Sequence, residues 1–115
     1  MRKRKRLTNR EILVLGLVWI EKEVLATAAE YSNILNIDEY EVRKAINLLD
    51  TKRWINKENC GRNGLRLTIG TKEIPGYAIK IINDNLSLYD NYFNLKSKQK
   101  IVMHLIKGGK RGQGQ

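Results

Sequence analysis

The sequence predicts a mainly helical chain with one small β-hairpin, an α+β fold, and further helices after the hairpin. Two capping boxes, which begin at Thr8 and Thr27, each mark the start of a helix. Residues 65–69 alternate apolar and polar side chains, as a half-buried strand does. The pair Asn63-Gly64 directly before that segment favours a hairpin turn.

The composition is that of a folded, single-domain protein. The chain has 115 residues, of which 42% are hydrophobic, enough for one buried core. Its single cysteine cannot form an internal disulfide, so nothing in the sequence requires an oxidising compartment. The longest apolar run, Ile12–Ile20, is much shorter than the roughly 20 residues that a membrane helix needs. We expect a cytoplasmic protein, nucleoid-associated if prokaryotic or viral, with no membrane partner.

Positive charge is concentrated in three blocks of the sequence. The net charge of +10 divides into +6 for residues 1–10, −5 for 11–50, +4 for 51–66, −1 for 67–95 and +6 for 96–115. Such an excess attracts polyanions, nucleic acid first and an anionic membrane surface second. Many basic proteins, however, carry lysines that are only solvated, so charge alone does not identify the partner.

The first helix is predicted from Leu7 to Glu23. Thr8 caps it, and Glu11 follows three residues later, the spacing at which both side chains satisfy free amide groups. Residues 12–20 are apolar on every face, so this helix must be covered on more than one side. It is either a central core helix or a helix that partly faces a second subunit.

Two shorter helices follow an extended connector at Val24–Ala26. The second capping box, Thr27 with Glu30, opens a helix over Ala28–Leu35. Asn36 suits the left-handed conformation at the end of that helix.

The next helix is predicted from Glu39 to about Lys52, with Asp38 as its N-cap. It is amphipathic, because apolar residues recur at spacings of four and three, at Val42, Ile46 and Leu49. Two short helices joined by a tight turn, the second amphipathic, form a helix-turn-helix arrangement.

The hairpin and the helices after it complete the predicted fold. Residues 54–58 and 65–69 form the hairpin strands. Residues 77–82 fit either a helix or a strand, and their place after the hairpin favours a helix. Residues 86–95 have helical three-and-four spacing, and Ser97 caps a last amphipathic helix.

Five short segments carry a resemblance to a known superfamily: Thr27–Tyr31, Leu35–Asp38, Val42–Ile46 with Leu48 and Leu49, Lys52–Ile55 and Arg62–Arg66. In that order they resemble the start of the second helix, the turn, the recognition helix, the helix-to-wing junction and the wing tip of winged helix-turn-helix DNA-binding domains. The resemblance covers about residues 8–70 and identifies no specific family. Arg53 stands where glycine is common, and because a left-handed non-glycine residue costs about 1 kcal/mol, we expect a differently shaped junction.

The resemblance and the composition together divide the chain into four parts. Residues 1–7 form a basic disordered arm, and 8–70 form the winged helix-turn-helix domain. Residues 71–107 form a C-terminal helical extension, a candidate dimerisation element by analogy with winged-helix regulators. Residues 108–115 form a disordered tail.

Three groups of residues are candidates for DNA contact. The recognition helix offers Tyr40, Arg43, Lys44 and Asn47. The wing offers Lys57, Arg62, Asn63 and Arg66. The basic arm offers Arg2, Lys3, Arg4, Lys5 and Arg6, a run suited to sequence-independent contact with phosphates.

The recognition helix carries the residues best suited to contact bases. Arg43 can bind guanine and Asn47 can bind adenine, each through two hydrogen bonds, whereas Tyr40 and Lys44 suit phosphates. The alternative is an ordinary solvated helix face. Three carboxylates at its start, which repel phosphates, favour that alternative: Asp38, Glu39 and Glu41.

Nothing in the sequence predicts an enzyme. His104 has no cysteine or carboxylate partner nearby in sequence, and Cys60 has no second thiol with which to build a zinc site. No glycine-rich phosphate loop follows a strand. We expect no metal, no cofactor and no small-molecule ligand.

The predicted function is sequence-specific binding of double-stranded DNA by a small, homodimeric transcriptional regulator. Three alternatives remain open at this point: a plasmid- or phage-type DNA replication or maintenance factor, a winged-helix protein-interaction module, and an RNA-binding protein.

Overall fold

The computed structural model describes residues 6–95 of the chain. In chain order its elements are α1 (Asn9–Glu21), β1 (Glu23–Ala26), α2 (Ala28–Leu35), α3 (Glu39–Thr51), β2 (Ile55–Asn59), the 3-10 turn η1 (Gly61–Asn63), β3 (Leu65–Ile69) and α4 (Gly76–Asp84). A further helical segment, residues 86–95, follows α4; we call it the C-terminal helical segment. The predicted α+β fold class, mainly helical with a small hairpin, is confirmed. Four predictions lie outside the described residues: arm residues 2–5, the helix from Ser97, His104 and the tail.

The first capping box forms as predicted and sets the start of α1. Thr8 Oγ1 accepts a hydrogen bond from the Glu11 amide at 3.2 Å, and the Glu11 carboxylate accepts one from the Thr8 amide at 3.1 Å. The helix is shorter than predicted, because Lys22 adopts a φ of +73° and its amide donates to Val18 O. Glu23 therefore belongs to β1 and not to α1.

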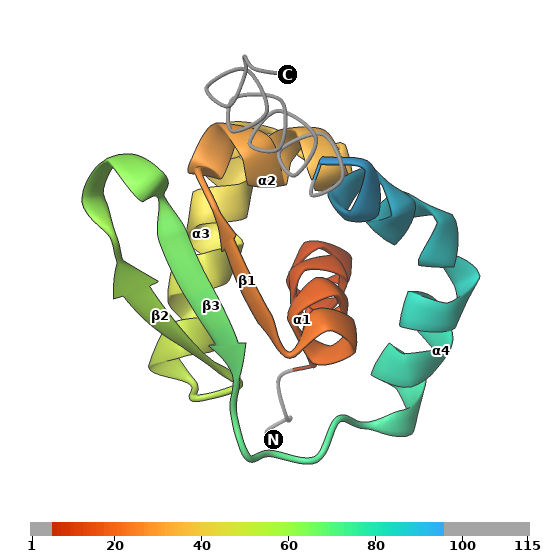
Figure 1. Ribbon diagram of the computed structural model, residues 1–115. Helices are drawn as coiled ribbons and strands as arrows, with labels where there is room; N and C mark the ends of the chain where they lie inside the picture. Colours follow the sequence, from red (N-terminus) through yellow and green to blue (C-terminus); the bar gives the residue numbers. More distant parts are fainter. Residues whose placement is uncertain (1–5, 96–115) are drawn as a thin grey trace, which may run out of the picture.

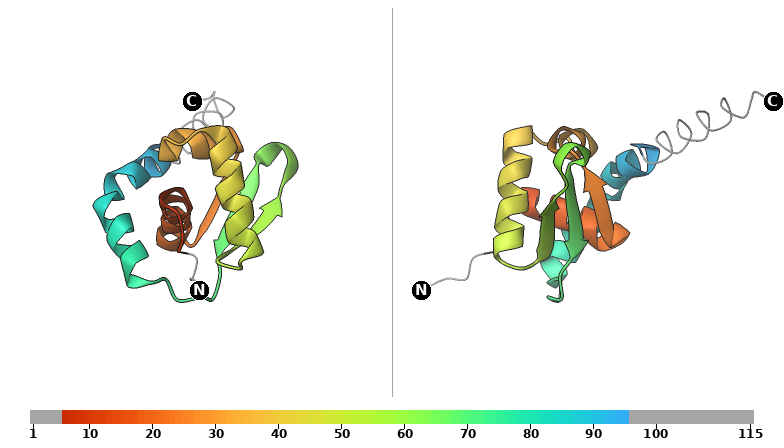
Figure 2. Two further views of the ribbon diagram at one scale, coloured as in Figure 1. Left: turned by 180° about the vertical axis from the view of Figure 1, so that it is seen from behind. Right: turned by 60° about the vertical axis from the view of Figure 1, so that its left-hand side comes forward.

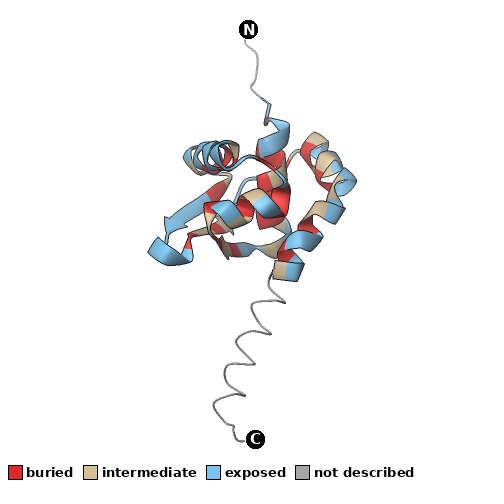
Figure 3. Cartoon of the chain, turned by 90° about the horizontal axis from the view of Figure 1, so that it is seen from above, coloured by how far each residue is buried: buried red, intermediate tan, exposed pale blue. Residues whose placement is uncertain are grey.

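α1 is the central helix of the fold. It packs against α3, α4, β1 and β3, and Figure 1 shows α3 and the sheet on one side of it with α4 on the other. Figure 3 shows how much of α1 is buried, in the residues Ile12, Val14, Leu15, Gly16, Leu17 and Val18. The chain itself covers most of the apolar surface of α1, with Ile20 near its end left 41% exposed, so a central core helix accounts for most of its composition.

The sheet has one strand more than the predicted hairpin. The residues Val24–Ala26, which the sequence suggests only as a connector, lie in β1 and pair with β3 in the strand order β1-β3-β2. The hairpin turn is also longer than a two-residue Asn-Gly turn, because the Cys60 amide donates to Gly64 O across η1 at 2.8 Å. Gly64 has a φ of +105° and lies against the Ala26 backbone, so a side chain there would collide with β1.

The helix-turn-helix forms close to its predicted bounds. α2 covers Ala28–Leu35 as predicted, and Asn36 is left-handed with a φ of +57°. Asp38 caps α3 by accepting from the Tyr40 amide at 3.0 Å. α3 buries one apolar stripe, made of Val42, Ala45, Ile46 and Leu49, and packs with it against α1.

Arg53 adopts the left-handed conformation that glycine usually supplies, so the expectation of a differently shaped junction is wrong. Its φ is +67°. The Trp54 amide donates to Leu49 O at 2.9 Å and the Arg53 amide to Asp50 O at 3.0 Å, the two bonds of a Schellman motif. Those bonds satisfy the last carbonyls of α3, and they hold the strained residue in place.

The C-terminal helical segment docks into a notch on α1. The Tyr89 hydroxyl donates to Leu13 O at 3.0 Å, beside Gly16. Burial raises the pKa of Tyr89, so its hydroxyl stays protonated and remains a donor.

Among the described residues, no helix is long and apolar enough to cross a bilayer.

We predict that Gly16→Ala destabilises the protein by about 1–3 kcal/mol, the usual cost of overpacking a dense core. A methyl group at Gly16 would overlap the Tyr89 hydroxyl and lie 2.8 Å from Ile82 Cγ1. Denaturant unfolding measures the change. The matched control is Gly76→Ala, at an open helical position where no atom lies within 4 Å. Equal stability of the two variants would contradict the notch.

Candidate nucleic-acid interface

The face of α3 opposite its apolar stripe is exposed over two turns. All four predicted residues of this helix are exposed, Tyr40 at 68%. We call this surface the α3 face; it consists of Tyr40, Arg43, Lys44 and Asn47. Because α1 takes the apolar stripe, the fold itself presents this surface to solvent.

Each of the three carboxylates at the start of α3 has a partner within the chain. Asp38 accepts from the backbone as the N-cap. Glu39 Oε2 pairs with Arg43 Nη2 at 3.0 Å, one helical turn along. Glu41 Oε1 lies 3.9 Å from Arg10 Nη1 on α1. The carboxylates that look unfavourable in the sequence are therefore engaged by a backbone amide and two guanidinium groups.

Lys57 lies against α3 and not at the wing tip. Its amide donates to Asp50 Oδ1 at 3.0 Å, and its Nζ donates to Asn47 Oδ1 at 2.7 Å. Seen from behind, α3 runs beside the hairpin (Figure 2), which brings these two predicted residues together from different elements. The contact fixes the amide of Asn47, with its nitrogen left as a donor.

The predicted wing residues divide into an exposed tip and an enclosed strand position. Arg62 and Asn63 lie in η1 and are exposed at the tip of the hairpin. Arg66 is the second residue of β3, with its Nε 3.5 Å from Glu23 Oε2 and 4.0 Å from Glu58 Oε1. The charge of Arg66 is thus balanced by carboxylates on both neighbouring strands, unlike that of Arg62.

A groove of about 200 Å³ joins the wing to α3. Arg43 contributes the charged wall, and the remaining lining residues come from α2 and the hairpin: Thr27, Ala28, Asn59, Gly61, Gly64 and Leu65. Tyr31 fixes this arrangement, since its hydroxyl donates to Leu65 O at 2.7 Å and also reaches Val24 O. Burial raises the pKa of Tyr31, which keeps the donating proton in place.

Two residues that the sequence does not single out have contacts near the predicted site: Arg10 lies beside the α3 face, and Tyr77 on α4 contacts Arg6. Arg10 lines a hollow of about 150 Å³ with Thr8, Lys44 and Leu48, among others. The guanidinium of Arg6 lies over the ring of Tyr77, with Arg6 Cζ 3.9 Å from the ring centroid. The sequence could have pointed to Arg10 as a candidate, because it lies close to the basic run at residues 2–6. No sequence pattern connects residues 6 and 77. Arm residues 2–5 lie outside the described range.

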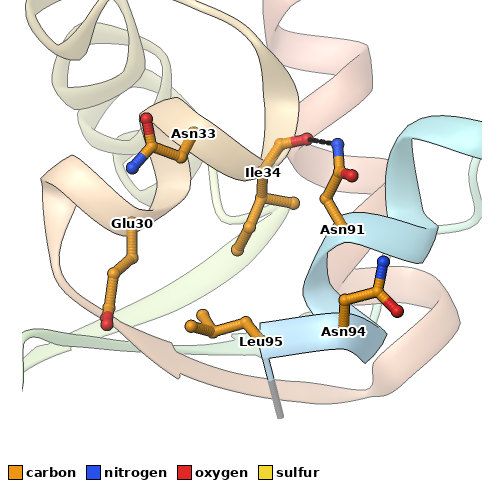
Figure 4. Close-up of a pocket in the computed structure, with 6 residues that line it drawn as sticks. All are labelled: Glu30, Asn33, Ile34, Asn91, Asn94 and Leu95. Carbon is orange, nitrogen blue, oxygen red and sulfur yellow. Dashed lines mark hydrogen bonds between the residues drawn. The ribbon is translucent and has the colours of Figure 1, made fainter. Parts of the chain in front are cut away.

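A separate pocket of about 280 Å³ lies between α2 and the C-terminal helical segment (Figure 4). Asn91 Nδ2 donates to Ile34 O at 2.9 Å and joins the two elements. The other lining residues are Glu30, Asn33, Asn94 and Leu95. Within residues 6–95, no group of three or more His, Cys, Asp or Glu side chains is placed to hold a metal ion.

Comparison with known proteins bears on the fold. No protein-family model matches the chain, and no curated protein matches its sequence. Wild-type ZitR from Lactococcus lactis is 18% identical, with 96% of this chain and 76% of ZitR covered at a TM-score of 0.52. Disulfide-formed AbfR is 15% identical, with 87% of this chain and 73% of AbfR covered at a TM-score of 0.51. ZitR in complex with DNA is 16% identical, with 96% and 77% covered at 0.46.

The likeness to ZitR and AbfR agrees with the element order and the strand pairing described above. Three helices, of which the second and third form a helix-turn-helix, are followed by a two-stranded wing that pairs with a strand between α1 and α2. The chain has the winged helix-turn-helix fold.

Proposed function

We propose that the protein binds double-stranded DNA in a sequence-specific manner and acts as a small transcriptional regulator. The observation that carries the proposal is the α3 face, a polar and basic helix surface that the core leaves exposed beside a basic wing tip. A helix of this kind fits the major groove, where base edges present distinct donors and acceptors. The fold is one on which such helices are commonly presented, and ZitR, which shares it, has been solved with DNA.

Asn47 is the residue of the α3 face best prepared for base contact. Lys57 Nζ already occupies one lone pair of its Oδ1, which fixes the amide and leaves Nδ2 as a donor. That donor suits the N7 of a purine or the O4 of thymine, and the second lone pair of Oδ1 is available for adenine N6. Arg43 by contrast must exchange Glu39 for a guanine before it can contact a base.

Phosphate contact falls to the exposed cations around α3. Arg62 at the wing tip has no carboxylate within ion-pair distance in the described part of the chain, whereas Arg66 is balanced by Glu23 and Glu58. We therefore assign backbone or minor-groove contact to Arg62 with Asn63, and not to Arg66. The basic arm adds contacts that carry no sequence information.

We predict that duplex DNA binds with a steep salt dependence, since each neutralised phosphate adds about −0.9 to the slope of log K against log salt. Binding titrations over a range of salt concentrations measure this slope. Arg62→Ala should reduce the magnitude of this slope by about 0.9, the contribution of one phosphate contact. Lys80→Ala, on the distant helix α4, should leave the slope unchanged. A slope near zero at low salt, or tighter binding to structured RNA than to duplex, would contradict the proposal.

Asn47→Ala is predicted to cost about 1–3 kcal/mol on a duplex selected by the protein, and much less on random duplex. Lys57→Met should lose part of the same specificity in the unmodified chain and none further in the Asn47→Ala background, because the two side chains act as one unit. Competition binding on both duplexes gives these energies. Retained binding in Asn47→Ala, with loss in Arg62→Ala, would instead make the wing the specificity element.

We also propose that the protein acts as a homodimer. Leu86 and Phe93 lie seven residues apart on the C-terminal helical segment, on one helix face, with exposures of 48% and 64%. A second copy would remove this apolar surface from water. Sedimentation at micromolar concentration is expected to give a dimer, and Phe93→Ser to shift it toward monomer. A strictly monomeric unmodified chain would contradict this proposal.

A further inference from the structure

We propose that Asp50 is a positioning residue for base recognition: it holds the Lys57 amide, and through Lys57 it fixes the side chain of Asn47 on the α3 face. This inference rests on the proposed function and deepens it. It gives a role in DNA binding to a carboxylate, a group that repels phosphates, without any contact between Asp50 and the duplex.

Lys57 lies on an edge strand of the sheet, with its amide turned away from β3. The strand order β1-β3-β2 leaves one side of β2 without a neighbouring strand. The Cys60 amide donates to Gly64 O at 2.8 Å, and because ladder bonds fall on alternate residues, the even-numbered residues of β2 face β3. Lys57 therefore faces outward, and Asp50 Oδ1, 3.0 Å from the amide nitrogen, accepts its hydrogen bond in place of a strand.

The side chain of Lys57 reaches the same helix by a second hydrogen bond. It lies on the same face of the strand as Ile55, which is fully buried. Its Nζ donates to Asn47 Oδ1 at 2.7 Å. Asn47 and Asp50 are three residues apart on α3 and are therefore neighbours on its surface. The helix thus holds both the backbone nitrogen and the side-chain nitrogen of one strand residue, where α3 runs beside the hairpin (Figure 2).

Asp50 occupies a position that is unfavourable for a carboxylate within the helix itself. α3 ends at Thr51, and an acidic side chain in the last turn opposes the negative partial charge of the helix C-terminus. Within residues 6–95, no ion pair involves this carboxylate. Its hydrogen bond is made to the Lys57 amide, and a bond to an ionised acceptor is stronger than one between neutral groups. The favourable contact of Asp50 is therefore with the wing strand and not with its own helix.

Fixing the backbone of Lys57 determines how Asn47 presents its amide. A free lysine side chain samples many rotamers, so a hydrogen bond between two exposed side chains persists only if their backbones are held at the right distance. Asp50 holds β2 at that distance from α3. Without this bond the edge strand can move away, and the amide of Asn47 can rotate so that its oxygen and nitrogen exchange places. The distinction between donor and acceptor, on which base recognition depends, would then be lost.

The test compares Asp50→Ala with Asp50→Asn in the full chain. Both variants remove the negative charge, but asparagine keeps an oxygen that can accept from the Lys57 amide. The measured quantity is the Kd on random duplex divided by the Kd on a duplex that the unmodified protein selects from a random library. We expect this ratio to fall about 3- to 10-fold for Asp50→Ala and less than about twofold for Asp50→Asn. The matched control is Asp84→Ala, which removes an exposed carboxylate from the last turn of α4 and should leave the ratio unchanged.

Two further measurements separate positioning from general stability. In the Asn47→Ala background, Asp50→Ala should change the ratio by less than about twofold, because the side chain that Asp50 positions is gone. Selection from the random library is then repeated with each single variant. Asp50→Ala and Asn47→Ala should lose base preference at the same base pair, whereas a general loss of stability would weaken all positions alike.

Three results would overturn this inference alone: an unchanged ratio in Asp50→Ala, an equal loss in Asp50→Asn, or a loss that persists in the Asn47→Ala background. In each of them the unmodified chain still prefers its selected duplex, so the proposed function stands. If the unmodified chain binds duplex without preference, or binds none, the proposed function fails and this inference fails with it.

Discussion

The burial of α1 is the constraint on which the other elements depend. A helix that is apolar on every face cannot lie at a surface, so the rest of the chain has to surround it. The sheet and α3 cover one side, and α4 with the C-terminal helical segment covers the other, where Tyr89 fits beside Gly16. α3 contributes its single apolar stripe to this packing and must therefore turn its polar residues outward. The surface proposed to contact DNA is a direct consequence of how α1 is covered.

Contacts within the chain also determine which of its charged side chains have partners. Residues 11–50 carry a net charge of −5, which on its own argues against a nucleic-acid surface. In the fold, Glu39 and Glu41 pair with guanidinium groups and Asp38 caps a helix, so none of them is an isolated carboxylate. Arg66 is likewise paired, with Glu23 and Glu58 on the two neighbouring strands. Which charges can act on a polyanion is thus decided by the contacts between elements and not by the count of charges.

Features encoded within a few residues could be predicted from the sequence, whereas features that join distant segments could not. Both capping boxes, the α2 bounds and the left-handed Asn36 depend on local hydrogen bonds, and all are confirmed. β1 resembles a connector in the sequence because its strand character comes from pairing with β3, some forty residues away. The contact of Lys57 with Asn47 and that of Arg6 with Tyr77 likewise bring together residues on different elements. The expectation for Arg53 is wrong because it weighs a local strain without the two Schellman bonds that offset it.

The charge pattern along α3 has a simple origin in the helix itself. The carboxylates Glu39 and Glu41 in its first turn complement the positive partial charge of the helix N-terminus, each worth about 0.3–1 kcal/mol, and the cations Lys52 and Arg53 follow directly after its last turn. This gain offsets part of the cost of the left-handed Arg53. The acidic start is then a feature of helix stability and is compatible with DNA binding. In the proposed function, base contact is assigned to the middle turns, where Arg43 and Asn47 lie one turn apart, and phosphate contact to the wing tip and the basic arm.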